Sequence, residues 1–281
     1  MTTHVPPPAV QSPAAAFAAR YRATTIPPVD LWSPVLDRVF AHATVRNYLP
    51  DPLPDGTLEV LVGAAQSAAS SSNLQLWSVI AVEDPARRAR LAALAGNQQH
   101  IAVAPLILLF VADLSRAARV ATRHGRPQEG LDYLDTFLVG ALDAALAAQN
   151  AVLAAESLGL GTVYIGALRN RITEVAAELK LPSHVAPVFG LVVGRPDPQK
   201  PAGIKPRLPQ SAVLHRETYG ADGEAEAIAA YDEQFHAFQN EQGLPRQDWS
   251  SVLAARIASA AFLNGRERLA DALRAFGFAL K

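Results

Sequence analysis

The stretch LDYLDTFLVGALDAALAAQNAVLAAESLGLGTVYIG, residues 131–166, decides the fold of this chain. Its first part, residues 131–157, is the longest helical pattern in the sequence and is apolar on more than one face. Gly159 is expected to end that helix, because glycine readily takes the left-handed conformation at a helix C-terminus. Residues 162–166 then predict a short strand. A helix this apolar is predicted to be central or to lie at a subunit interface.

Apolar runs and helical spacings on either side extend this pattern into an α+β chain. Strands are predicted at 76–82, 101–112 and 188–193. Helices are predicted at 34–42, 55–69 with Asp55 as N-cap, 85–96, 170–181, 224–242, 250–263 and 266–276. Residues 123–130 are expected to form a polar loop. Residues 194–210, with five prolines and two glycines, are expected to form an irregular excursion.

The composition is that of a folded protein whose redox chemistry, if any, needs a bound cofactor. Half of the 281 residues are hydrophobic and 18% are charged, which suffices for a sizeable core. The 25 Lys and Arg residues against 26 Asp and Glu give a net charge of −1, so nucleic acid is not predicted as a partner. With no cysteine, disulfides, thiolate nucleophiles, iron–sulfur clusters and cysteine-based zinc sites are excluded.

Neither a membrane span nor a secretory signal is predicted. The most apolar stretch, residues 101–112, falls short of the ~18 residues that a span needs, and Pro105 interrupts it. Residues 1–31 are expected to be a flexible Ala/Pro-rich extension without the unbroken apolar run of a signal peptide. Arg20 and Arg22, with no acid before Asp30, leave a mitochondrial transit peptide as the alternative to a cytoplasmic location.

Motifs of several common enzyme classes are missing from the sequence. There is no GxxxxGK[ST] loop, no GxSxG elbow and no HExxH, and the seven histidines are scattered, so hydrolase and metal-centred chemistry is not indicated. The segment from Gly159 to Gly166 lacks the third glycine of a dinucleotide fingerprint, because position 164 is Tyr.

Four polar segments follow apolar elements and carry the groups that could bind a ligand. They are HATVRNY at 42–48, ASSSNLQ at 69–75, YIGALR at 164–169 and KPR at 205–207. Imidazole, hydroxyl and guanidinium groups suit a phosphate or a sugar hydroxyl. Taken singly, two of these segments also have a plain structural explanation. The serine-rich segment is typical of a simple turn, and the glycine in YIGALR is typical of a turn from a strand into a helix.

Taken together, the segments resemble the nitroreductase family of FMN-dependent oxidoreductases, in the branch of the major oxygen-insensitive NADPH nitroreductase and flavin reductase P. The resemblance spans 32–281 and also includes NQQHIAVAP (97–105), AQNAVLAAESLGLGTVYIGALRN (148–170), LKLPSHVAPVFGLVVGRP (179–196) and KPRLPQSAVLHRETY (205–219). It implies a mixed sheet flanked by helices, an intertwined homodimer with FMN at the interface, and a helical C-terminal excursion over 194–281.

The resemblance also implies the roles of individual residues. The FMN-binding set would be His42, Thr44, Arg46, Ser70, Ser71, Ser72, Gln75, Gln98, Tyr164, Ile165, Gly166, Ala167, Leu168, Lys205 and Arg207. Lys205 and Arg207 would clamp the phosphate, and the Gly166 backbone would approach flavin N5. The nicotinamide cofactor and the acceptor would meet Ser72, Asn73, Arg246 and Arg266. No side chain would act as a covalent catalyst.

The implied activity is a ping-pong transfer of two electrons from NADPH to a nitroaromatic, a quinone or a flavin. The chain departs from the family at Ala43, often Arg, and at Asn73, often aromatic, so the acceptor is not specified. The loop 241–246 holds a single arginine, which leaves NADH open as a donor. Flavin-fragmenting or dehalogenating chemistry on the same fold, and a non-catalytic FMN-binding protein, are the alternatives.

Overall fold

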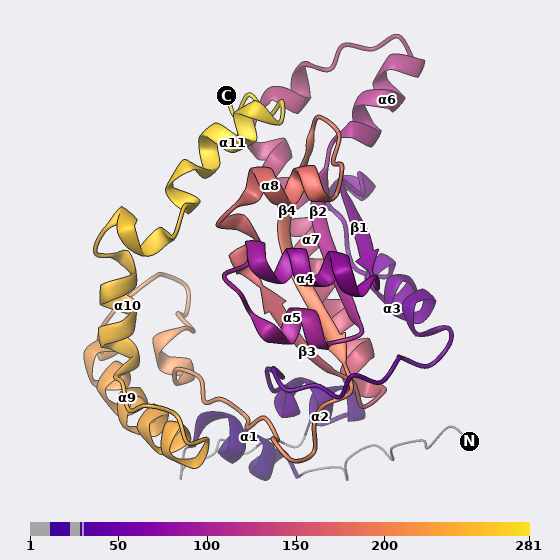
Figure 1. Cartoon of the computed structure of the whole chain (residues 1–281). Coiled ribbons are helices and arrows are strands. Elements are labelled where there is room, and N and C mark those ends of the chain that lie inside the picture. The colour runs from indigo at the N-terminus through magenta and orange to yellow at the C-terminus, as the bar shows by residue number, and fades with distance from the viewer. Residues whose placement is uncertain (1–11, 23–28, 30) are drawn as a thin grey trace. The chain divides into compact units, whose positions relative to one another are not determined.

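The computed structural model describes residues 12–22, 29 and 31–281 (Figure 1). The chain divides into two compact units. Unit 1 comprises Met1–Thr44 and Pro201–Phe262, and unit 2 comprises Val45–Lys200 and Leu263–Lys281. The domain boundary predicted between residues 31 and 32 falls inside unit 1.

Unit 2 is built on a four-stranded sheet, and the predicted α+β class is confirmed. The strands are β1 (Trp77–Val82), β2 (Leu106–Asp113), β3 (Gly161–Ile165) and β4 (Val185–Gly194), in the order β1-β2-β4-β3. Each of the three pairs is antiparallel, so the described strands show no parallel pair of the kind that a mixed sheet contains. Strand β2 is buried along its whole length, as its central position requires.

Helices cover both faces of this sheet. The helices of unit 2 are α3 (Thr57–Gln66), α4 (Pro85–Leu94), α5 (Gln99–Val103), α6 (Ser115–Arg123), α7 (Leu134–Ser157), α8 (Ile172–Glu178) and α11 (Leu269–Ala275), with the short 3-10 turns η1 (Ser71–Asn73), η2 (Glu129–Asp132), η3 (Gly166–Arg169) and η6 (Arg266–Arg268). Figure 1 shows α4 and α5 in front of the sheet and α7 behind it. The helix predicted over 131–157 is therefore central, and it ends before Gly159, whose φ is 76°.

Helix α7 has two different apolar faces. Small side chains on one face are buried against β2, β4 and α3: Ala144, Ala147, Ala148, Ala151, Val152 and Ala155. The other face carries exposed leucines four residues apart, Leu134, Leu138, Leu142 and Leu146. Among the described residues α7 is the one helix long and apolar enough to cross a membrane. Its alanine face packs on the sheet, as in the core helix of a globular fold.

Gly140 allows α7 to approach the sheet closely. A Cβ at this position would stand 2.8 Å from the carbonyl oxygen of Leu76 and 3.2 Å from Cβ of Ala112. Atoms this close cannot be accommodated unless the backbone moves. The absence of a side chain at Gly140 therefore sets the distance between helix and sheet.

The predicted strand 101–112 is wrong in its first half. Residues 99–103 form helix α5, and the strand begins at Leu106. Pro105 separates the two, since a proline disfavours the helical conformation in the residue before it; Ala104 accordingly has ψ 143°. The continuous apolar run concealed this change from helix to strand.

Two further differences concern helix boundaries. Helix α3 begins at Thr57 rather than Asp55, because Gly56, at φ 79°, is the N-cap, and it ends at Gln66 rather than residue 69. Helix α6 was not predicted, although the loop predicted over 123–130 follows it directly. The apolar residues of α6 are three alanines and one valine that share one face of a nine-residue helix, so the periodicity is present but short, and the sequence analysis did not recognise it.

Unit 1 contains α1 (Pro13–Tyr21), α2 (Pro34–Ala41), η4 (Gln210–Ala212), α9 (Glu224–Glu241) and α10 (Trp249–Ile257), and is followed by η5 (Ala260–Leu263). The predicted flexible extension is wrong for α1. Ser12 caps this helix by accepting a hydrogen bond from the Ala15 amide (3.2 Å), and Pro13 starts its first turn. The remainder of that prediction, residues 1–11, 23–28 and 30, lies outside the described residues.

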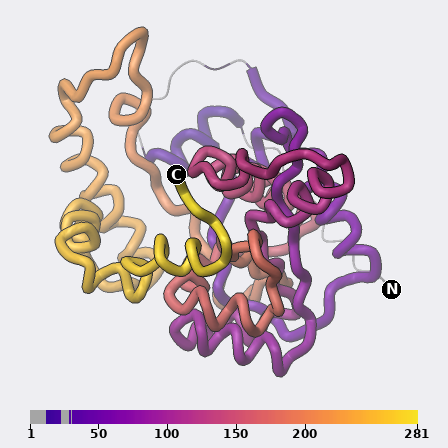
Figure 2. Tube along the Cα trace, turned by 90° about the horizontal axis from the view of Figure 1, so that it is seen from above, coloured from indigo at the N-terminus to yellow at the C-terminus, as the bar shows by residue number. Residues whose placement is uncertain are grey.

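The C-terminal helices of unit 1 pack against each other. Helices α9 and α10 lie side by side (Figures 1 and 2), with the Tyr231 and Trp249 rings 5.4 Å apart. The Asp232 carboxylate accepts hydrogen bonds from the amide (3.1 Å) and the hydroxyl (2.5 Å) of Ser250 at the start of α10. Both helices were predicted from their spacing, and α10 ends earlier than the predicted 263.

We predict that Gly140→Ala lowers the free energy of unfolding by about 1–3 kcal/mol, because the added methyl overpacks the contact with Leu76. The matched control is Gly63→Ala in α3, where nothing lies within 4 Å of the new Cβ. That variant should be neutral or stabilising by up to ~1 kcal/mol, since alanine is the better helix former. Chemical denaturation measures both, and equal effects would contradict the proposed close contact.

Candidate functional site

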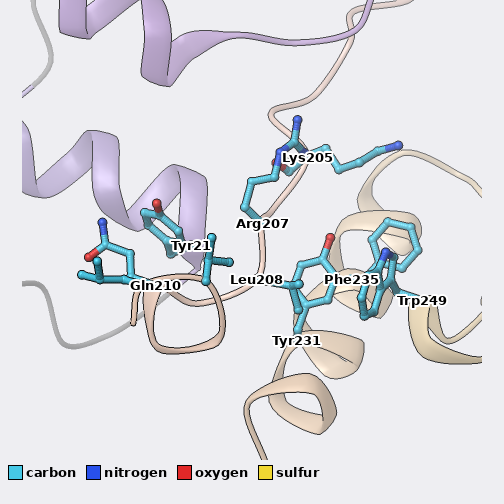
Figure 3. A pocket seen from close by; sticks show the side chains of 10 residues that line it. Tyr21, Lys205, Arg207, Leu208, Gln210, Tyr231, Phe235 and Trp249 are labelled. Atoms are coloured by element: carbon cyan, nitrogen blue, oxygen red, sulfur yellow. Dashed lines mark hydrogen bonds between the residues drawn. The ribbon is translucent and has the colours of Figure 1, made fainter. Parts of the chain in front are cut away.

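Unit 1 holds a cavity of about 860 Å³ with two cations and four aromatic rings in its lining, one of them Tyr21 at the end of α1 (Figure 3). Lys205 and Arg207 come from the irregular segment that the sequence singled out. Tyr231, Phe235 and Trp249 come from α9 and α10 and were not predicted as site residues. The Lys205 ammonium lies 6.0 Å from the centre of the Phe235 ring, within cation–π range.

Hydrogen bonds between side chains of α9 and its C-cap and the backbone of residues 203–206 fix the segment that carries the two cations. The buried Tyr231 hydroxyl donates to the carbonyl of Pro206 (3.1 Å), and the Gly203 amide donates to Oε1 of Gln242 (2.9 Å). Burial raises the pKa of Tyr231, so the phenol keeps the proton that it donates. Lys205 and Arg207 thus emerge from a rigid backbone.

His42 and Thr44 also lie in unit 1. His42 follows α2 as its C-cap, and its carbonyl accepts a hydrogen bond from Arg20 in α1 (2.8 Å). The same Arg20 donates to the carbonyl of Lys205 (2.8 Å). The structure therefore brings the backbone of His42 and that of Lys205 to one guanidinium.

In unit 2, the loop Ser70–Gln75 is held by Asp143, a residue that sequence analysis missed. The Asp143 carboxylate, 2% exposed on α7, accepts from the Ser70 hydroxyl (2.7 Å) and the Ser71 amide (3.0 Å). The Ser70 oxygen in turn accepts from the Gln75 amide (2.9 Å). Since the only proton of the Ser70 hydroxyl goes to Asp143, this hydroxyl can offer a ligand an acceptor but no donor.

The same loop has a strained backbone and borders a polar cavity. Ser72, Asn73 and Gln75 have φ of 48°, 54° and 52°, in the left-handed region that L-residues seldom adopt. Arg116 on α6 closes the loop by donating to the Gln75 carbonyl (2.9 Å). A cavity of about 350 Å³ lies beside it, lined among others by Ser70, Asn73, Gln75 and Arg116. Such strain is commonly found at ligand-binding segments.

Arg46 and Gln98 lie in unit 2 as well. Gln98 is the N-cap of α5, and its side chain donates to the carbonyl of Ala95 (2.9 Å). The pKa of His100 is lowered by burial and then by the positive charge of Arg46. His100 is therefore neutral at pH 7, and Arg46, which is exposed, can pair with an anion.

At most positions of the turn after β3, only backbone groups are available to a ligand. The Ile165 and Leu168 side chains are buried, at 1% and 0% exposed, so these two residues cannot contact a ligand through their side chains. Gly166 opens the turn and presents no side chain. Tyr164 is 39% exposed and its hydroxyl donates to Oε1 of Gln149 (3.3 Å). Burial raises its pKa to about 12, so it stays protonated.

Two arginines gather at this turn, and one of them was not predicted. Burial and the positive charge of Arg266 lower the pKa of Arg169. Arg169 donates to the carbonyl of Val188, and Arg266 to Oδ1 of Asn170 (2.8 Å). The nearest atom to a Cβ built at Gly166 would be Nη2 of Arg169 at 3.4 Å. The predicted residues Gly166 and Arg266 therefore lie at one positively charged turn.

Arg246 lies in unit 1, at the end of the loop that follows α9. Its side chain is 73% exposed and lies 3.9 Å from the carboxylate of Glu233. An exposed ion pair at this distance contributes little to stability and leaves the guanidinium accessible to solvent.

Comparison with known proteins identifies the family. The Nitroreductase family model matches residues 39–195, and the model of the Nitroreductase family C-terminal domain matches residues 205–281. The chain belongs to the nitroreductase family, as the sequence predicted.

Individual relatives agree with this assignment over most of their length. The chain is 40% identical over 240 residues to an FMN reductase [NAD(P)H] of Bacillus subtilis, covering 84% of this chain and 95% of that protein. It is 39% identical to an oxygen-insensitive NADPH nitroreductase of Salmonella typhimurium, covering 78% and 88%.

Solved structures give the same result for the fold. NfrA2 of Bacillus megaterium matches with a TM-score of 0.83 at 37% identity, covering 89% of this chain and all of that one. An NADPH:FMN oxidoreductase from Vibrio harveyi, complexed with NAD⁺, matches with a TM-score of 0.78 at 33% identity, also covering 89% and 100%. The nitroreductase-type fold is thereby confirmed.

We predict that Asp143→Ala lowers the free energy of unfolding by about 2–4 kcal/mol, because the Ser70 hydroxyl and the Ser71 amide lose a charged acceptor. Asp135→Ala, on an exposed part of the same helix, is the control and should cost less than ~1 kcal/mol. Urea denaturation compares the two. A similar stability for both variants would show that Asp143 does not hold the loop.

Proposed function

We propose that this protein is an FMN-dependent NAD(P)H oxidoreductase that reduces electron-poor acceptors such as nitroaromatics, quinones or flavins. The proposal rests on one observation. The chain belongs to the nitroreductase family, and the residues that this family resemblance assigns to FMN have the charges and polar groups that FMN needs. The resemblance assigns FMN binding to three of the features described above, which are the cation pair Lys205 and Arg207 on a fixed backbone, the strained polar loop Ser70–Gln75 and the turn at Gly166. When bound, FMN supplies the atom that accepts a hydride and returns two electrons to the second substrate.

The phosphate and ribityl chain suit the residues proposed in unit 1. Lys205 and Arg207 offer two positive charges, and Arg207 adds the planar fork that matches a phosphate. His42 and Thr44 add an imidazole and a hydroxyl for the sugar alcohol groups. Arg46, in unit 2, is proposed for the same anionic part of the cofactor.

The ring system suits the residues proposed in unit 2. Ser71, Ser72, Gln75 and Gln98 offer hydroxyl and amide groups for the polar edge of the ring, and Ser70 offers an acceptor. The backbone of Gly166, Ala167 and Leu168, with Tyr164 and Ile165 before it, is proposed to approach N5, because a hydride needs an edge without a bulky side chain. Arg169 and Arg266 place positive charge at this turn and favour a ring that has gained an electron pair.

The second substrate site is proposed at Ser72, Asn73, Arg246 and Arg266. Asn73 and Ser72 are exposed, so they can face an incoming acceptor. Arg246 and Arg266 are the candidates for the 2′-phosphate of NADPH, since a guanidinium binds a phosphate through two parallel hydrogen bonds.

The test is an anaerobic stopped-flow titration of the FMN-loaded protein with NADPH and, separately, NADH, followed by flavin absorbance. We expect rapid bleaching by NADPH at much lower concentration than by NADH, and recovery of absorbance when a nitroaromatic is added. Bleaching by neither nucleotide would overturn the oxidoreductase and favour a non-catalytic FMN-binding protein.

The same assay shows which of Arg246 and Arg266 binds the 2′-phosphate of NADPH. The variant that loses the 2′-phosphate contact should lose about tenfold of the preference for NADPH over NADH, the effect of one charge-assisted contact. A change in the charge near the flavin would alter the response to both nucleotides alike and leave that ratio unchanged. Arg246→Ala and Arg266→Ala are compared for this purpose, with Arg268→Ala on the neighbouring exposed surface as control.

We also propose that the protein is a homodimer with FMN at the interface, located in the cytoplasm. The loop Ser70–Gln75 enters β1 and the turn Gly166–Arg169 leaves β3, and these strands are the opposite edges of the sheet. Three strand spacings separate them, about 14 Å. A second copy could bring its own loop to the Gly166 turn. The exposed leucines of α7, between 45% and 62% exposed, provide an apolar surface for that copy.

We predict that Leu142→Asp weakens the dimer at least about 100-fold, because an unpaired carboxylate would be buried between the copies. Val120→Asp on α6, where the native side chain is 49% exposed, is the matched control and should leave the dimer intact. Analytical ultracentrifugation measures both. A wild-type protein that sediments as a monomer at micromolar concentration would contradict the dimer itself.

A further inference from the structure

Helix α1 lies before the residues that the family model matches, which begin at residue 39, yet it is firmly packed within unit 1. The Phe17 ring lies 4.9 Å from Phe40 and 6.4 Å from Trp32. At the end of the helix, Arg22 forms a two-pronged ion pair with Glu241 on α9 and stacks 5.9 Å from the Phe238 ring. These contacts hold α1 against both α2 and α9.

Arg20 of this helix joins two segments that are far apart in the sequence. It is 7% exposed. Its Nη1 donates to the carbonyl of Lys205 (2.8 Å), and its Nη2 donates to the carbonyls of Phe40 and His42 (both 2.8 Å). In the other direction, the Arg207 amide donates to the carbonyl of Arg20 (3.1 Å). The end of α2 and the segment Lys205–Arg207 are thus both hydrogen-bonded to one residue of α1.

Only a guanidinium fits this arrangement. Its planar fork offers five donors in fixed directions, so it can serve three carbonyls at once, whereas a lysine ammonium is a single point on a flexible stem. Because the group is buried, each charge-assisted hydrogen bond is stronger than it would be in water. Arg20 therefore restricts the backbone at His42 and at Lys205 together.

We propose that Arg20 is a positioning residue for the phosphate of FMN, and that α1, which lies before the residues that the family model matches, is a built-in support of that site. The inference rests on the proposed function, since His42, Lys205 and Arg207 are the residues proposed to bind the phosphate and ribityl chain. Arg20 is hydrogen-bonded to the backbone of all three residues. By fixing the cations beforehand, it lowers the entropy that phosphate binding would otherwise cost.

The experiment compares FMN with riboflavin, which lacks the phosphate, by fluorescence titration of the apoprotein. Arg20→Met removes the three hydrogen bonds at similar length. It should raise the dissociation constant of FMN roughly tenfold, the effect of losing one well-placed charge-assisted contact, and that of riboflavin less than about twofold. A merely structural role of Arg20 would weaken both ligands equally. Arg22→Gln, which loosens α1 at Glu241 without touching the three carbonyls, is the control and should shift neither ligand more than about twofold.

Hydrogen exchange gives a second readout that needs no ligand. The Arg207 amide, bonded to the Arg20 carbonyl, should exchange faster in Arg20→Met than in Arg22→Gln. If Arg20→Met does not fold, Arg20→Lys keeps the charge without the fork and should show the same selective loss of FMN affinity.

The outcomes separate the two proposals. A wild-type protein that binds FMN while Arg20→Met and Arg20→Lys keep its preference for FMN over riboflavin would overturn the inference alone. A wild-type protein that binds no FMN would overturn the proposed function and the phosphate role with it. Unchanged exchange at Arg207 would show that Arg20 does not restrain the segment.

Discussion

The close contact between helix α7 and the sheet is the constraint on which unit 2 depends. Gly140 leaves no Cβ between the helix and the carbonyl of Leu76, and the alanines that follow lie flat on β2. One turn after Gly140, on the same side of the helix, the short side chain of Asp143 can therefore reach Ser70 and Ser71. A larger residue at 140 would move the helix, and with it the carboxylate that holds the polar loop.

Buried charges that bind backbone groups recur in both units. Asp143 accepts from an amide and a hydroxyl, and Arg20 donates to three carbonyls. Each is a charged group in the interior whose hydrogen-bond partners offset the cost of its burial. Each fixes the backbone of a segment that carries residues proposed to bind the ligand. The fold thus separates the residues that hold the candidate site from those proposed to touch the ligand.

Helices and strands whose residues follow one clear pattern could be predicted from the sequence. A segment whose residues suit a helix and a strand equally could not. The apolar run at 188–193 and the long apolar helix ending before Gly159 were recognised correctly. The run 101–112 was misassigned because apolar residues suit a buried helix and a buried strand equally, and only Pro105 marks the change. Helix α6 was missed because its apolar face is short and consists of three alanines and one valine.

For the site, the sequence by itself determined the family and the residue types that suit a phosphate and a flavin edge, because these lie in short contiguous segments such as 69–75 and 205–207. It could not reveal Asp143, Arg20, Arg169 or the aromatic lining from α9 and α10. Each of these acts on a segment distant in the chain, and an isolated Asp or Arg in a helix looks like a solvated side chain. Only the tertiary structure decides which of them is buried and which backbone groups it binds.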